Sequence, residues 1–582
     1  MKQQEIAVLF SQMADLLEFR GANPFRVRAY RRAAMSLDGF GGDLDRLVQE
    51  GRVRAKISGV GEDLDAKIAE YCGTGRIREI EREGKAAPKG LFDLLAVPGI
   101  GPKTARLLSD RLKITSVDAL ERAAKAHRLQ QLPGFHERKE QNVLRGVAIL
   151  RGGRERMHLG IAVPQAEELV AFLKNIRGVE RASAAGSLRR MRETIGDLDL
   201  LVATRQSARV MRAFTRAPFC AKILAAGDTK ASIVTPQGLQ VDLRVVPPES
   251  YGAALQYFTG SKEHNVRLRE LASRRGLKIN EYGVFRLKTN RRLGGGEETD
   301  IYQALGLPWI PPELREDRGE IAAAQANRLP RLVERKDLRG DFHLHSTWSD
   351  GGDSLEVMAR AAAARGYEYA ALCDHSQSLK VAHGMSVARL KQQARKVRAL
   401  NQRFRNFRLL MGSEVDILAD GRMDYPSEVL AQLDFVVGSV HSGFSRPQAE
   451  QTRRIERAME NPYVTVIGHP TGRLMGQREA YAVDLERLFR TAKATGTAME
   501  INGQPKRLDL NDAAAHRARE SGVMLTLATD SHSVAQLEQV VYGLAVARRA
   551  WLEPGDLLNT KSLKELLAWI GRKRSRTHRR TT

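Results

Sequence analysis

The chain has 582 residues, a formal net charge of +25 at pH 7 and a pI of about 10.1. Its length allows three or four domains, and its charge indicates a polyanionic partner, most simply nucleic acid. No apolar run reaches the ~18 residues of a membrane span, and the N-terminus lacks the apolar core of a signal peptide. We therefore expect a soluble cytoplasmic protein, associated with the nucleoid and not with a membrane.

Glycine turns interrupt the helical spacing of apolar residues that runs through residues 1–150. Gly59-Val60-Gly61 and Gly99-Ile100-Gly101 each place a Gly-x-Gly at a helix start, where bare backbone N–H groups can hold a phosphate. Lys103 follows the second turn. Both turns resemble helix-hairpin-helix motifs, which grip the DNA backbone without reading its sequence. Leu132-Pro133-Gly134-Phe135 is either a third, degenerate copy or an ordinary turn.

Three acidic residues lie on strand-like segments in the middle of the chain. Asp197-Leu198-Asp199 projects two carboxylates to one face, because side chains alternate with a period of two along a strand. Asp242, in a second segment with the same alternation, supplies a third carboxylate. Asp-x-Asp alone is common at exposed strand ends, but Asp242 and the preceding Gly186-Ser187 turn favour a site for paired Mg²⁺ or Mn²⁺ ions.

This pattern resembles the nucleotidyltransferase superfamily, and the segment after it resembles the thumb of family X DNA polymerases. That segment reads Tyr257-Phe258-Thr259-Gly260-Ser261-Lys262-Glu263-His264-Asn265 and continues to Arg269. The resemblance implies that the phosphates of an incoming dNTP contact Gly186, Ser187 and Arg190. It also implies that the sugar contacts Tyr257, Phe258 and Gly260, that Asn265 reaches the base and that Arg269 touches the template strand.

Six of the thirteen histidines follow apolar, strand-like runs between Gly340 and His532. In (β/α) barrels the catalytic groups stand at the C-terminal ends of the strands, so ligands from distant segments converge at one mouth. Histidine mixed with Asp and Glu, without cysteine, suits two or three Mn²⁺, Zn²⁺ or Fe ions in a hydrolytic site, with Glu414 able to bridge two of them. The runs end in these candidate ligands: His343 and His345, His375, Glu414, His441, His469, and Asp530 with His532.

The first of these runs, His343-x-His345 with Asp350, resembles the first motif of the PHP (polymerase and histidinol phosphatase) family. The remaining candidate ligands follow in the order of that family, over roughly residues 338–569. The resemblance implies a distorted (β/α)7 barrel that holds up to three metal ions and hydrolyses phosphoesters, including DNA ends.

Residues 23–32 and 59–68 resemble the small helical domain that binds a 5′-phosphate in gapped DNA. In animal members of that group, the lysine that matches Lys67 forms a Schiff base with an abasic sugar. Here Asp63 and Asp65 stand nearby and favour the charged ammonium, so we expect only weak lyase activity from Lys67.

Over essentially its whole length the chain resembles bacterial family X DNA polymerases with a C-terminal PHP domain, a multidomain α+β fold. We expect an N-terminal domain (1–85), helix-hairpin-helix fingers (86–152), a nucleotidyltransferase palm (153–246), a thumb (247–318), a linker (319–337) and a C-terminal barrel (338–575). The basic tail from Arg572 to Arg580 is expected to be disordered.

The expected function is template-directed repair synthesis by a monomer that fills short gaps, with a metal-dependent 3′-5′ exonuclease or phosphoesterase in the same chain. Two alternatives remain open. One is an end-processing phosphoesterase whose polymerase half is inactive and only binds DNA. The other is a template-independent terminal transferase, because Gly-Ser and Asp-x-Asp occur across the superfamily.

Overall fold

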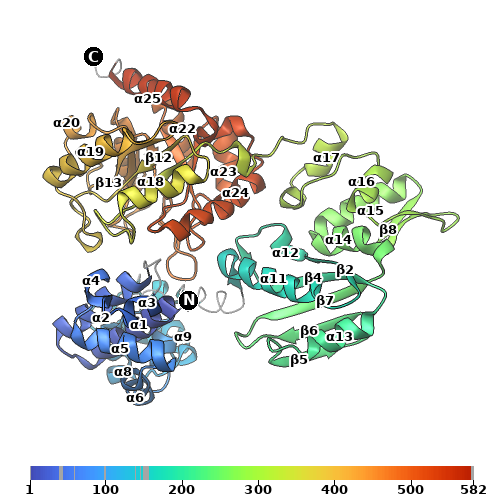
Figure 1. Ribbon diagram of the computed structural model, residues 1–582, viewed down its shortest axis with the longest axis horizontal. Coiled ribbons are helices and arrows are strands. Elements are labelled where there is room, and N and C mark those ends of the chain that lie inside the picture. The colour runs from blue at the N-terminus through green and yellow to red at the C-terminus, as the bar shows by residue number, and fades with distance from the viewer. Residues whose placement is uncertain are drawn as a thin grey trace.

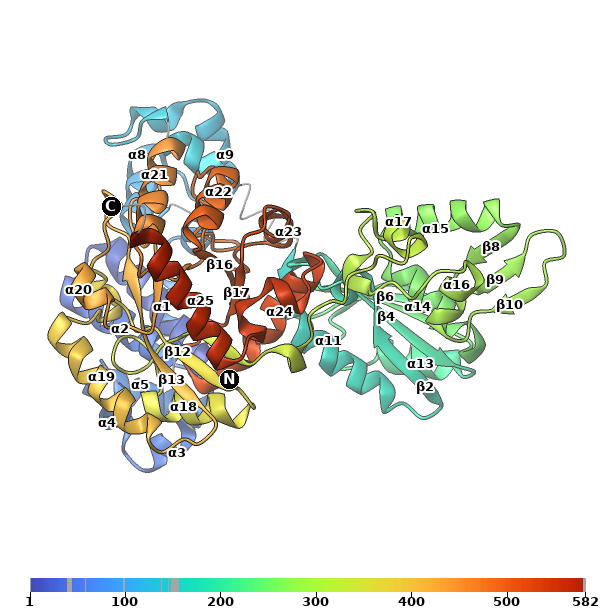
Figure 2. The ribbon, with the colours of Figure 1, turned by 90° about the horizontal axis from the view of Figure 1, so that it is seen from above.

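The computed structural model describes residues 2–38, 44–57, 59–97, 100–137, 139–144, 146–147 and 156–578. In chain order it contains two helical units, a mixed sheet with its helices, and a parallel barrel (Figures 1 and 2). None of the described helices is long and apolar enough to cross a membrane.

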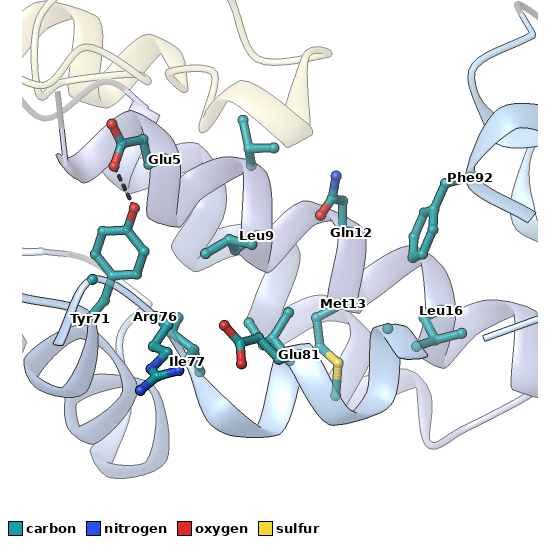
Figure 3. A pocket seen from close by; sticks show the side chains of 14 residues that line it. Glu5, Leu9, Gln12, Met13, Leu16, Tyr71, Arg76, Ile77, Glu81 and Phe92 are labelled. Carbon is teal, nitrogen blue, oxygen red and sulfur yellow. Dashed lines mark hydrogen bonds between the residues drawn. The ribbon is translucent and has the colours of Figure 1, made fainter. Parts of the chain in front are cut away.

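The N-terminal domain and the fingers share helix α1 (Lys2–Arg20). One apolar face of α1 packs in the core of the N-terminal domain, whereas Leu16 and Phe19 join the core of the fingers. A pocket of about 580 Å³ opens along α1, with Tyr71 and Phe92 among its walls (Figure 3). The other helices are α2 (Pro24–Asp38), α3 (Leu44–Gln49), α4 (Val53–Lys56), α5 (Glu62–Thr74), α6 (Arg78–Lys85), α7 (Leu91–Leu95), α8 (Pro102–Leu112), α9 (Val117–Lys125) and the 3₁₀ helix η1 (Arg128–Gln131).

The palm is a five-stranded sheet in the order β2-β4-β7-β6-β5. Its central strands β4 and β7 run parallel, and each alternates buried and half-buried residues where the acids lie. Helix α11 packs on this sheet. The elements are β1 (Met157–His158), α11 (Leu159–Lys174), β2 (Val179–Ala184), α12 (Gly186–Arg189), β3 (Thr194–Ile195), β4 (Asp197–Thr204), α13 (Ser207–Thr215), β5 (Lys222–Ala226), β6 (Lys230–Val234) and β7 (Gln240–Val246).

The thumb combines helices with a three-stranded antiparallel sheet in the order β10-β9-β8. Its helix α14 contacts β4 of the palm, which joins the two units. The elements are η2 (Pro248–Ser250), α14 (Tyr251–Thr259), α15 (Lys262–Arg274), β8 (Leu277–Asn280), β9 (Gly283–Arg286), β10 (Arg292–Gly294), α16 (Glu298–Ala304) and η3 (Pro312–Leu314).

The C-terminal barrel has seven parallel strands in sequence order, β11 to β17. A bridge between Leu344 and Ser531 brings the first and last strands together, which confirms the expected (β/α)7 architecture. The strands are β11 (Gly340–Leu344), β12 (Tyr369–Leu372), β13 (Arg408–Asp416), β14 (Phe435–Ser439), β15 (Val466–Ile467), β16 (Ala498–Asn502) and β17 (Leu525–Ala528). The helices are α18 (Leu355–Ala364), α19 (Val387–Asn401), α20 (Ser427–Leu430), α21 (Gln448–Glu460), α22 (Leu485–Thr495), α23 (Asp512–Glu520), α24 (Val540–Arg549) and α25 (Leu563–His578).

The linker and the C-terminal tail are both packed against other parts of the protein. In the linker, helix α17 (Glu320–Gln325) begins with a buried Glu320 whose Oε1 lies 2.6 Å from His264 Nδ1 of the thumb. The expectation of a disordered tail is wrong as far as His578, because α25 continues to that residue. Lys573 of α25 is buried and donates to Thr497 Oγ1 at 2.8 Å. Residues far away in the sequence thus bind charged side chains that the composition of these segments predicts to be exposed.

Candidate active sites

The three palm carboxylates lie together on one face of the sheet. Strands β4 and β7 pair so that Asp199 stands opposite Asp242, and the period of two puts Asp197 on the same face. One carboxylate oxygen from each of the three lies within 4.8 Å of the other two. Burial, with the charges of Asp197 and Asp242, raises the pKa of Asp199 to about 7. Carboxylates that repel one another in this way attract divalent cations, so these residues fit a pair of metal ions.

A pocket of about 530 Å³ opens beside these carboxylates. Gly186 stands at φ 59°, and a Cβ there would lie 2.0 Å from Asp199 Oδ2, so the turn and the strand approach this closely only with glycine. The pocket is lined by Gly186, Ser187, Arg190, Asp197, Asp199, Tyr257, Phe258, Gly260, Asn265 and Arg269, all singled out from the sequence, and by Arg156, Arg192 and Lys262, which were not.

The side-chain amide of Asn265, expected to reach a nucleotide base, is engaged at both ends. Its Nδ2 donates to the Tyr257 carbonyl at 2.7 Å, and its Oδ1 accepts from Gln256 Nε2 at 2.7 Å. Its backbone carbonyl accepts from Arg269 Nε at 3.3 Å. The amide therefore holds α14 against α15, and a base contact would require it to exchange one of these partners.

Glu414, on β13, stands among the histidines at the C-terminal ends of the barrel strands. Its carboxylate oxygens lie 3.2 Å from His441 Nε2, 2.9 Å from His375 Nδ1 and 2.9 Å from His469 Nε2. Burial disfavours the charge on Glu414, but the histidines outweigh burial and hold its pKa well below the usual value. A buried, ionised carboxylate in this position fits a bridge between two cations.

Two further groups of side chains offer ligand atoms within 4.8 Å of one another, namely His345, Asp350, His375 and His532, and His343, His345 and Asp530. Burial, with the neighbouring His532, lowers the pKa of His345 to about 3, so the imidazole is neutral, as metal binding requires. Among the described residues, buried ring nitrogens without a hydrogen-bond partner belong to His158, in the palm, and to His343, His345, His375 and His469, in the barrel. The predicted barrel ligands therefore come together in a set that fits more than one metal ion.

Two acidic residues that we did not predict from the sequence contact the Nδ1 atoms of barrel histidines. Glu500, on β16, lies 2.7 Å from His343 Nδ1, and Asp416 lies 2.5 Å from His441 Nδ1. Such partners fix the tautomer and the orientation of a metal-binding histidine. Asp374, which directly precedes His375 in the sequence, accepts a hydrogen bond from Ser346 N at 2.8 Å and belongs to none of the candidate metal-ligand groups.

Arg507 lies beside the barrel ligands, with its Nε 3.5 Å from Asp530 Oδ2. Its side chain is 16% exposed, and its Nε and Nη1 are buried without a hydrogen-bond partner in the part of the chain that the structure describes. Asp530 is also a candidate metal ligand, so a phosphate group would supply Arg507 with a second anion and with hydrogen-bond acceptors.

Gly61 and Gly101 directly precede helices α5 and α8, in extended conformation, and a Cβ at either position would meet nothing within 4 Å. The first turn of α5 contains three acidic residues, whereas that of α8 contains none and carries the exposed Lys103. Because a carboxylate competes with phosphate at a helix N-terminus, the start of α8 is the better suited of the two to bind a phosphate.

The other two glycines predicted to contact DNA, Gly59 and Gly99, do not directly precede a described helix. Gly59, at φ 79°, packs against the side chain of Arg32, so its role includes a close approach within the N-terminal domain. Gly99 lies outside the described residues.

Replacing Gly101 by valine is expected to lower DNA affinity about threefold or more, equally on unrelated sequences, because the side chain covers the N–H groups of α8. Gly61→Val is the matched control and should have a smaller effect, since acids already compensate α5. Binding is measured by fluorescence anisotropy at several salt concentrations. A loss confined to one sequence, or equal losses in both variants, would contradict this assignment.

Lys67, the candidate lyase nucleophile, is buried and engaged by two carboxylates. Its Nζ donates to Asp63 Oδ1 and lies 3.0 Å from Glu79 Oε2. Burial disfavours the ammonium, but the hydrogen bonds to Asp63 and Glu79 outweigh burial and raise the pKa of Lys67 above its ordinary value. Asp65 instead pairs with Arg54 at 3.4 Å. The free amine that Schiff-base chemistry needs is therefore scarce at neutral pH.

Comparison with known proteins finds four family models that match parts of the chain. A helix-hairpin-helix domain matches residues 1–77, a SAM-like helix-hairpin-helix tandem residues 91–147, a DNA polymerase beta thumb residues 254–316 and a PHP domain residues 341–504. The chain is 39% identical, over 574 residues, to the DNA polymerase/3′-5′ exonuclease PolX of Bacillus subtilis (strain 168). The aligned region covers 98% of this chain and 100% of that relative.

Shorter relatives match about two fifths of the chain. A probable phosphatase of Thermoanaerobacter sp. (strain X514) is 29% identical over 241 residues, which are 39% of this chain and 93% of that relative. A probable phosphatase of Acetivibrio thermocellus is 28% identical over 252 residues, 41% of this chain and 98% of that relative.

Proposed function

Because the chain belongs to the family X DNA polymerases of the PolX type, with a PHP domain, we propose that it fills short gaps in DNA and trims DNA 3′ ends. Template-directed synthesis takes place in the palm, and 3′-5′ exonuclease hydrolysis takes place in the C-terminal barrel. The observation that carries this proposal is the presence of two separate sets of metal-ligand side chains, one carboxylate and one rich in histidine.

In the palm, Asp197, Asp199 and Asp242 would hold two Mg²⁺ or Mn²⁺ ions. Metal bound there would supply activation of the primer 3′-hydroxyl and neutralisation of the triphosphate charge. Ser187 and Arg190 bind the phosphates of the dNTP. The side chains of Tyr257 and Phe258 contact its sugar, and their position in the pocket beside the carboxylates supports that role.

In the barrel, Glu414, the surrounding histidines, Asp350 and Asp530 would hold two or three Mn²⁺, Zn²⁺ or Fe ions. Metal bound there would supply Lewis-acid chemistry for phosphodiester hydrolysis. Arg507 binds the phosphate of the substrate, since its buried Nε and Nη1 make no hydrogen bond among the described residues and its ion-pair partner, Asp530, is itself a proposed metal ligand.

We also propose that the protein works as a monomer on gapped and primer-template DNA. Its charge of +25 favours nonspecific contact with the nucleoid, and the turn at Gly101 with Lys103 grips the phosphate backbone. The N-terminal domain anchors the 5′-phosphate of a gap.

One gel tests the proposal, with a gapped duplex labelled at the primer 5′ end, Mn²⁺, and the presence or absence of dNTPs. With dNTPs the primer should lengthen to fill the gap, and without them it should shorten from its 3′ end. Shortening without extension would indicate an end-processing phosphoesterase. Extension that is equal with and without a template strand would indicate a terminal transferase.

Lys67 is expected to give at most a weak covalent adduct when incised abasic DNA is treated with borohydride, because its raised pKa keeps the amine protonated at pH 7. Replacing Asp63 by Asn and Glu79 by Gln should lower that pKa and strengthen the adduct. Lys67→Ala should remove it. An adduct of undiminished strength in Lys67→Ala would assign the chemistry to another lysine.

A further inference from the structure

Helix α24 of the C-terminal barrel lies on the side of the barrel that faces the palm and the thumb (Figures 1 and 2). Ala545 of α24 packs in the core of the palm, so this contact is part of the folded protein. Arg549, the last residue of α24, is 4% exposed. Its Nη1 donates to the backbone carbonyl of Arg190 at 2.8 Å. A side chain of the barrel therefore touches a residue of the nucleotide pocket.

Glu316, which follows the thumb 3₁₀ helix η3, connects the same two arginines. Its Oε1 accepts from Arg549 Nη1 at 2.9 Å and from Arg190 Nε at 3.0 Å, and its Oε2 accepts from Arg192 Nη1 at 3.2 Å. The Glu316 side chain is 9% exposed. Burial opposes its charge, but Arg549 and Arg190 outweigh burial and lower its pKa. One ionised carboxylate is thus shared among three guanidinium groups, two of which line the nucleotide pocket.

The barrel holds Arg549 from its other side. Arg549 Nη2 donates to Asp512 Oδ2 at 2.9 Å, at the start of α23, and Asp512 also accepts from Arg318 Nη1 at 3.0 Å. Arg190 is fixed in turn by the thumb, because its Nη1 donates to the Thr259 carbonyl. The chain of contacts runs from the barrel through Arg549 and Glu316 to Arg190.

We propose that Arg549 is a positioning residue for dNTP binding, through which docking of the barrel sets the affinity of the palm for the triphosphate. Without Arg549, the negative charge of Glu316 falls on Arg190 and Arg192 alone, and it competes with the triphosphate for them. The backbone of Arg190 also loses a hydrogen bond. This inference rests on the proposed polymerase function, and it assigns the barrel a part in synthesis besides hydrolysis.

The test compares Arg549→Gln with Arg548→Gln in the full-length protein. Arg548 lies in the same helix and the same interface. It donates to Glu313 Oε1 at 2.7 Å and to the Val333 carbonyl at 3.1 Å, and not to Glu316 or Arg190. Arg549→Gln is expected to raise KM for dNTP, and the Kd from equilibrium dialysis with Mg²⁺ and no primer, about tenfold, with kcat within about twofold. Arg548→Gln should change KM by no more than about twofold.

A rescue separates the charge effect from a loss of docking. Glu316→Gln in the Arg549→Gln background removes the uncompensated carboxylate and should bring KM back to within about threefold of the parent. Exonuclease activity and metal content should stay unchanged in all three variants. Equal KM values for Arg548→Gln and Arg549→Gln, or no rescue by Glu316→Gln, would overturn the inference. A parent protein that neither binds dNTP nor extends a primer would instead refute the polymerase function itself.

Discussion

Asp199→Ala is expected to lower kcat for primer extension about a thousandfold or more, with DNA affinity nearly unchanged. Burial, together with the charges of Asp197 and Asp242, raises the pKa of Asp199 to about 7. Removal of one carboxylate leaves the paired ions with too little negative charge at the transition state, so turnover suffers more than binding. Single-nucleotide gap filling under saturating dNTP measures this loss.

The same variant provides its own control in the barrel, whose exonuclease activity should remain at the parent level. In the parent protein, Mg²⁺ should bind the palm more weakly as the pH falls through about 7, because the raised pKa of Asp199 lets a proton compete with the metal. Near-normal extension by Asp199→Ala would mean that the catalytic strand lies elsewhere.

The palm site could be predicted from local rules to a large extent. A period of two along β4 is a property of any strand, so Asp197 and Asp199 had to share a face once the segment was extended. That β7 would pair with β4 and bring Asp242 opposite Asp199 required tertiary structure, but the matched alternation of the two segments indicated it. Arg156 and Arg192 had no such pattern, because their place in the pocket depends on the folding of the turns between strands.

In the barrel, contacts between residues far apart in the sequence could not be predicted. Its histidines stand at strand ends, where a sequence pattern can find them, but β16 went undetected because no histidine follows it. Glu500 on that strand acts through His343, a residue 157 positions away in the chain. Lys573 and Glu320 likewise found buried partners at a distance, and no local rule assigns a charged residue to such a partner.

Replacing His343 and His345 together by alanine is expected to abolish the exonuclease, by about a thousandfold or more, while primer extension is retained. Both side chains are fully buried, and they belong with Asp530 to one group of ligand atoms. Loss of both imidazoles leaves that group with carboxylate alone, so the content of tightly bound metal should fall by at least one ion per chain. Elemental analysis and release of a labelled 3′-terminal nucleotide measure the two effects.

His516→Ala is the matched control, because His516 lies on α23 of the same barrel and contacts the Ala550 carbonyl at 3.0 Å instead of the ligand groups. It should keep both the metal and the exonuclease. If the double variant folded but lost primer extension as well, the two chemistries would share one site. Retained hydrolysis with unchanged metal content would show that the histidine cluster is not where DNA ends are cut. Because the two sites lie in different parts of the chain, metal content, exonuclease activity and primer extension can all be measured on one preparation of each variant.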